Sequence, residues 1–162
     1  MEDVVKEMGH LCLGSRLKRL GERMQADVQK VIDEAGLPIQ TSHYPLLAAI
    51  DRNGPLTVGY LVEALGVSQP GVTRSIARLA DTGFVEVSRE HRDQRRKTVS
   101  LTPSGREAVE RSKRDVWPRI EAAVKNMCAD LSGPLLEQLG AVEEALSGEP
   151  LDKRAARAGE KR

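Results

Sequence analysis

The sequence predicts a mainly α-helical protein with one small β-hairpin. Three observations indicate this class. Apolar residues recur every three or four positions along both ends of the 162-residue chain, which is the period of one helix face. Between these ends, short helical patterns are separated by glycines. Two segments rich in β-branched residues, "FVEVSR" and "KTVSL", then flank a polar stretch and are typical of paired strands.

Composition limits the classes of function. The length suits one domain, or a small domain with extensions. Charges interrupt every hydrophobic stretch, so we expect a soluble, cytoplasmic protein that contacts no membrane. Cys12 and Cys128 lie far apart, which argues against a disulfide framework or a zinc site. With one Trp, two Tyr and one Phe, the chain has too few rings to stack single-stranded bases, so a nucleic-acid partner would be a duplex.

Residues 1–40 predict an N-terminal dimerisation helix. The helix is expected to run from Glu2 to Ala35 and to be stopped by Gly36 and Pro38. Its apolar stripe consists of Leu13, Leu17, Leu20, Met24, Val28 and Val31. A narrow stripe that repeats over several turns needs more cover than a small domain offers, so a helix of a second subunit is its simplest partner.

Residues 41–102 predict three short helices followed by the hairpin. Each helix has a candidate N-cap, and these are Ser42, Thr57 and Ser68. Gly66 stands where a tight turn between the second and third helices needs a glycine, and Gly83 closes the third helix. The segment carries eight basic against six acidic residues. This modest positive excess is concentrated in residues 88–102, which include five basic residues and the expected hairpin loop from Glu90 to Arg96.

The third of these helices has two different faces. Val72, Ile76 and Leu79 follow the i, i+4, i+7 spacing of a buried stripe. The other side carries Gln69, Thr73, Arg74, Ala77 and Arg78. Polar groups at one-turn spacing on an exposed helix suit the base edges and phosphates of a DNA major groove.

Residues 103–148 predict C-terminal dimerisation helices. Thr102 and Pro103 open the first of them, which Pro118 is expected to kink. After "SGP" at 132–134, a last amphipathic helix carries Leu135, Leu139, Val142 and Leu146. Residues 149–162 are expected to form a disordered basic tail.

Together these elements describe a winged helix-turn-helix between long terminal helices that form a dimerisation region. The candidate DNA-binding residues are Ser68, Gln69, Gly71, Thr73, Arg74 and Arg78 on the third helix, and Arg92, Arg95, Arg96 and Lys97 on the hairpin. The basic hairpin can reach a neighbouring minor groove, where negative potential is concentrated. Asp93 is expected to order the hairpin tip by accepting a hydrogen bond from Arg95 or from a backbone N–H.

Two stretches resemble the MarR family of bacterial transcriptional regulators. "LTVGYLVEALGVSQPGVTRSIARLADTGFVEV" at 56–87 is similar to the helix-turn-helix of that family, and "DQRRKTVSLTPSGR" at 93–106 is similar to its wing. The resemblance implies an obligate homodimer, a pseudo-palindromic double-stranded operator, and Arg95 as the residue that enters the minor groove. It also implies repression that is released by a small aromatic molecule or by thiol oxidation.

Several residues have more than one interpretation. Cys12 lies where peroxide-sensing members carry a reactive cysteine, so a thiol-based redox-sensing repressor is an alternative. Such sensors use tyrosine hydroxyls that this helix lacks, which favours a buried, inert thiol. His43 and Tyr44 lie where family members line an effector cavity, but simple packing of a helix start explains them equally well. Arg74 or Arg78 could instead pair with Asp81 or Glu86 at the surface.

A second class of function is a winged-helix protein-interaction module whose hairpin and terminal helices bind another protein. We expect no enzyme, no catalytic residues and no cofactor, because the sequence has no phosphate-binding loop, zinc-protease motif or nucleophile elbow. The histidines His10, His43 and His91 lack the spacing of metal ligands, so we expect no metal. The effector, the operator sequence and the sign of regulation are left open by the sequence.

Overall fold

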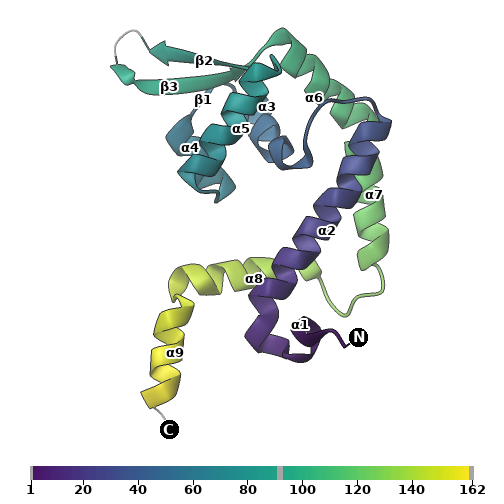
Figure 1. Cartoon of the computed structure of the whole chain (residues 1–162), viewed down its shortest axis with the longest axis vertical. Helices are drawn as coiled ribbons and strands as arrows, with labels where there is room; N and C mark the ends of the chain where they lie inside the picture. Colours follow the sequence, from purple (N-terminus) through teal and green to yellow (C-terminus); the bar gives the residue numbers. More distant parts are fainter. Residues whose placement is uncertain (1, 91–92, 161–162) are drawn as a thin grey trace. The chain divides into compact units, whose positions relative to one another are not determined.

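A computed structural model describes residues 2–90 and 93–160, with the side chains of 89–90, 93–96 and 158–160 outside the description (Figure 1). The described chain is mainly helical and contains a three-stranded antiparallel sheet, which confirms the predicted fold class. It divides into two compact units, Met1–Ile120 and Glu121–Arg162, which are treated separately below. None of the described helices combines the length and apolar character that a membrane span needs.

The N-terminal segment is interrupted where one continuous helix was predicted. A short helix α1, Val4–Glu7, and a 3₁₀ turn, Gly9–Cys12, precede the long helix α2, Leu13–Glu34. The prediction fails at Gly9, whose φ of +53° lies in the left-handed region and breaks the helical ladder. The predicted end is confirmed, since the N–H of Leu37 returns to the carbonyl of Ile32 at 3.3 Å.

Helix α3, Tyr44–Asn53, begins later than predicted. A 3₁₀ turn over Thr41–His43 leads into it and places His43 at the N-cap position, so the prediction of a Ser42 cap is wrong. Gln29 of α2 holds this turn. Its side-chain oxygen accepts from the N–H of Thr41 at 2.8 Å, and its amide donates to the carbonyl of Ile39 at 3.1 Å.

The helix-turn-helix is confirmed as α4, Val58–Leu65, and α5, Gln69–Asp81. Thr57 caps α4 by accepting from the N–H of Tyr60 at 3.2 Å. Gly66, with φ +60°, allows the tight turn between the two helices. Ser68 occupies the N-cap position of α5 but its side chain makes no capping hydrogen bond, so it caps by position only.

The sheet has the order β1-β3-β2, formed by Leu56–Thr57, Asp93–Leu101 and Val85–Glu90 respectively. Val99 of β3 lies opposite Leu56 on one side and Val87 on the other. The hairpin of β2 and β3 is confirmed, but the predicted loop from Glu90 to Arg96 is too long, because Glu90 already pairs with Asp93. The register shifts between Arg89, which pairs with Lys97, and Glu90, which pairs with Asp93, so the ladder is irregular in this polar part of the hairpin.

The main core lies between α3, α4, α5, the sheet and α6, Pro103–Asp115. Its buried members include Leu46, Leu47 and Ile50 of α3. They also include Val72, Ile76 and Leu79, the buried stripe predicted for α5. Each such side chain contributes about 1.5–3 kcal/mol when fully buried. This packing fixes which side of α5 is turned outward.

Helix α6 and the following α7, Trp117–Cys128, are separated at Val116, which confirms a break near Pro118. Thr102 caps α6 as predicted, since its hydroxyl accepts from the N–H of Gly105 at 3.0 Å. A second, smaller apolar cluster of Ile32, Leu37 and Val116 joins the end of α2 to this break.

The second unit contains α8, Leu135–Gly148, and α9, Leu151–Glu160. The prediction of disorder from Glu149 onward is wrong for α9. Arg154 donates to the carbonyls of Ala145 at 2.6 Å and Glu149 at 2.8 Å, and Arg157 pairs with the Glu149 carboxylate at 2.8 Å. These contacts tie the start of α9 to the end of α8.

Candidate nucleic-acid interface

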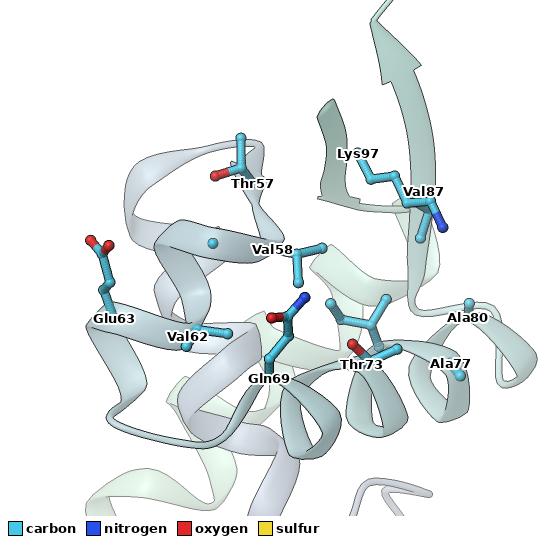
Figure 2. A pocket seen from close by; sticks show the side chains of 12 residues that line it. Thr57, Val58, Val62, Glu63, Gln69, Thr73, Ala77, Ala80, Val87 and Lys97 are labelled. Carbon is cyan, nitrogen blue, oxygen red and sulfur yellow. The ribbon is translucent and has the colours of Figure 1, made fainter. Parts of the chain in front are cut away.

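A groove of about 850 Å³ lies between α4, α5 and the hairpin strands (Figure 2). One wall is formed by α5, which contributes Gln69, Thr73, Ile76, Ala77 and Ala80. The start of α4 contributes Val58 and Gly59, and the hairpin contributes Val87 and Lys97. The groove therefore brings together one face of the second helix of the helix-turn-helix and one face of the wing.

The orientation of α5 follows from its sequence. Val72, Ile76 and Leu79 are at most 6 % exposed and hold one side of the helix in the core. Helical geometry then turns Gln69 and Thr73 outward, four residues apart on the same flank. Figure 2 shows both side chains extending from α5 into the groove.

The two predicted arginines of α5 lie elsewhere. Arg74 is exposed, and its Nε donates to the carbonyl of Pro70 at 3.4 Å within the same helix. Arg78 lines a separate hollow of about 470 Å³ together with His43. Among the described residues no ion pair joins either arginine to Asp81 or Glu86.

Gly71 stands away from the groove as well. A methyl group at its Cα would lie 2.9 Å from Cγ1 of Val67 and 3.3 Å from Oγ of Ser68. The absent side chain therefore lets the first turn of α5 fold closely against the preceding turn. Its contact with DNA stays a prediction.

The hairpin residues are described to different extents. Lys97 is exposed on β3 and lines the groove opposite α5. Strand β3 includes the backbone of Asp93, Arg95 and Arg96, but the side chains of these residues are outside the description. The contact of Asp93 with Arg95 therefore stays a prediction. Arg92 lies outside the described residues.

His43 and Tyr44 face different surroundings. His43 is 6 % exposed and lines the smaller hollow. Burial lowers the pKa of its imidazole below the ordinary 6.5, and the positive charge of Arg78 lowers it further. Tyr44 instead packs edge-to-face on Trp117 with ring centroids 6.2 Å apart, and burial raises the pKa of its hydroxyl. Of the two predicted pocket residues, His43 lines a hollow, and Tyr44 packs against the apolar clusters.

Cys12 is half-buried, and its thiol lies 3.8 Å from Sδ of Met8. Cys128 is also half-buried and unbridged. Among the described residues, no group of three or more His, Cys, Asp or Glu side chains could hold a metal ion.

Comparison with known sequences identifies the central region. Residues 35–96 match the sequence profile of the MarR family. An HTH-type transcriptional regulator of Mycobacterium tuberculosis is 36 % identical over 77 residues, which are 48 % of this chain and 54 % of that protein. The HTH-type regulator YwhA of Bacillus subtilis is 31 % identical over 83 residues, or 50 % of this chain and 60 % of its own length. The chain thus spans about half the length of the curated relatives it matches, and their names are those of regulators rather than enzymes.

Solved structures show the same fold over most of the chain. A mutant of MarR from Escherichia coli in complex with operator DNA is 20 % identical, with a TM-score of 0.68 over 91 % of this chain and 98 % of that one. BpsR of Bordetella bronchiseptica, whose DNA binding is regulated by 6-hydroxynicotinic acid, is 25 % identical, with a TM-score of 0.64 over 83 % and 98 %. Residues 35–96 thus match the MarR family, and the described chain shares the winged-helix fold of these solved structures.

Proposed function

We propose that this chain is a dimeric transcriptional regulator that binds a specific double-stranded operator. The observation that carries the proposal is the joint placement of Gln69 and Thr73 on α5 and Lys97 on the wing along one groove. A helix with such polar groups suits a major groove, and a cationic hairpin beside it suits the neighbouring phosphates and minor groove. The complex of the structurally similar MarR with operator DNA supports this use of the fold.

The apolar row of α2 supports a dimer. Leu13, Leu17, Leu20 and Met24 remain between 39 % and 47 % exposed. They recur at helical spacing along one face, which suits a matching helix of a second copy. A two-fold dimer would place two copies of α5 about 34 Å apart, one turn of DNA or a multiple of it, and would therefore read a pseudo-palindrome.

The hollow beside His43 supports regulation by a small molecule. Arg78 of α5 and His43, at the N-cap position of α3, both line it, so a ligand there would contact the proposed recognition helix directly. The guanidinium of Arg78 can donate hydrogen bonds to the carboxylate of a small aromatic acid. We infer that the chain is a repressor released by such an effector, an inference that the regulation of BpsR by 6-hydroxynicotinic acid supports by analogy.

Footprinting with the full chain tests DNA recognition. We expect protection of a discrete site with two related half-sites. Uniform weak binding that disappears at moderate salt would instead support a protein-interaction module. Replacement Arg95→Ala is expected to weaken operator binding by about 1–3 kcal/mol and to make its salt dependence shallower. Lys30→Ala, which removes a cation from α2, is the matched control and should leave operator affinity unchanged.

Sedimentation tests the dimer. The double replacement Leu17→Glu and Leu20→Glu places two charges in the apolar row of α2 and should convert the dimer to a monomer. Lys18→Glu changes charge on the same helix outside the row and should leave the dimer intact. A wild-type chain that sediments as a monomer would contradict the proposal.

A further inference from the structure

We propose that α5 reads A·T base pairs directly, with Gln69 binding adenine and the methyl groups of Thr73 and Ala77 contacting the 5-methyl of thymine. This inference rests on the proposed function and names the base pairs that the same site would recognise. It concerns only the side chains of α5 that line the groove, which form one row along that helix.

The row contains no cation. The five residues of α5 along the groove are one amide, one hydroxyl and three aliphatic side chains. Arg78 lines the other hollow, and Arg74 lines neither. Guanine is usually read by a bidentate arginine or lysine on O6 and N7, so this wall lacks the group that would select G·C pairs.

The chemistry of the three exposed members fits A·T pairs. A glutamine amide can donate to N7 and accept from the N6 amino group of adenine, a pattern that G·C pairs do not offer. The methyl groups of threonine and alanine make apolar contact with the thymine methyl, which cytosine lacks. All three residues are exposed on the outward flank of α5.

Gln69 is free for such a contact. It is the first residue of α5, the end of a recognition helix that reaches base edges, and its amide makes no side-chain hydrogen bond to a described residue. Figure 2 shows the amide in the groove between α4 and α5. Gln69, Thr73 and Ala77 follow one another at about 6 Å along the axis, close to two base-pair steps of about 3.4 Å. The row therefore predicts A·T pairs at alternate positions of a half-site.

The first experiment selects binding sites for the full chain from a pool of random duplexes. Half-sites with A·T pairs at alternate positions support the inference, and G·C pairs throughout the half-site overturn it. Failure to select any sequence would overturn the proposed function itself, so the two failures are distinguishable.

The second experiment replaces thymine by deoxyuridine in the selected duplex, which removes only the 5-methyl group. We expect affinity to fall about fourfold for each contacted methyl lost. Thr73→Ser keeps the hydroxyl and removes the protein methyl, so this variant should bind the thymine and uracil duplexes equally at its position. Arg74→Ala is the matched control, expected to weaken both duplexes and preserve their ratio.

The third experiment replaces adenine by 7-deazaadenine in the selected duplex. The wild-type chain should lose affinity about tenfold at the position read by Gln69, while Gln69→Ala should bind both duplexes alike. Equal binding of thymine and uracil duplexes by the wild-type chain, or undiminished discrimination by Thr73→Ser or Gln69→Ala, would overturn the assignment.

Discussion

Tyr44 and Ser112 join α3 to α6 through hydroxyl groups 3.0 Å apart. Ser112 is fully buried and donates to the carbonyl of Ala108 at 2.7 Å, so the Tyr44 hydroxyl is the donor in the pair. The Tyr44 ring packs against both apolar clusters of the first unit, as does Trp117. This aromatic pair therefore connects the winged helix to the end of α2 and the start of α7.

Replacement Tyr44→Phe keeps the ring and removes this hydrogen bond. We expect the free energy of unfolding to fall by about 1 kcal/mol, because Ser112 keeps its bond to Ala108 and only one net hydrogen bond is lost. Urea denaturation measures the change. Tyr60→Phe, at a tyrosine 47 % exposed, is the control and should leave stability unchanged. Equal effects of the two replacements would contradict the role given to the pair.

Gly105 of α6 cannot carry a side chain in this packing. A Cβ there would lie 1.9 Å from the carbonyl oxygen of Phe84, which is backbone and cannot rotate away. Gly105→Ala is expected to lower the free energy of unfolding by more than about 2 kcal/mol. Gly59→Ala is the control, since a Cβ there meets nothing within 4 Å. Because Gly59 lies within a helix, Gly59→Ala should leave the free energy of unfolding unchanged or raise it slightly in the same denaturation assay.

The two candidate caps Thr102 and Ser68 should differ in their contribution to stability. The Thr102 hydroxyl donates to the carbonyl of Gly83 at 2.6 Å and accepts from the N–H of Gly105. Thr102→Ala should therefore cost about 1–2 kcal/mol. Ser68→Ala should cost less, because Ser68 makes no side-chain capping bond. Thermal unfolding of both variants tests the order, and a larger loss for Ser68→Ala would refute it.

His43 should make stability depend on pH. Because burial and then Arg78 lower the pKa of folded His43, the unfolded chain takes up a proton more readily below its ordinary pKa of 6.5. The contribution of His43 is complete above pH 6.5 and is lost as pH falls towards its folded pKa. His43→Gln should flatten this part of a plot of unfolding free energy against pH.

The sequence predicts the elements where local signals agree. Helix α4 has a cap and a turn residue, Thr57 and Gly66, at the ends of an apolar period, and it forms where these signals place it. Helix α6 likewise begins where Thr102 and Pro103 precede an apolar period. The sequence does not indicate the short strand β1, because β1 depends on backbone pairing with β3, which is distant in sequence. The early start of β3 at Asp93 is not indicated either, because its first residues are polar and lack the apolar alternation of a strand. Helix α9 was missed because its contacts with α8 come from arginines, which composition alone counts as solvent-exposed charge.

What the sequence by itself determined is the order of elements and the polar character of α5, since both follow from local spacing and capping. Only the tertiary structure decided which polar residues of α5 face the groove and which face the hollow beside His43. Burial of Val72, Ile76 and Leu79 fixes the rotation of α5, which turns Gln69 and Thr73 to the groove and Arg78 to the hollow with His43. Helical periodicity places all of them on the polar side, but the neighbours of each side chain depend on how α4, the wing and α3 pack around the helix.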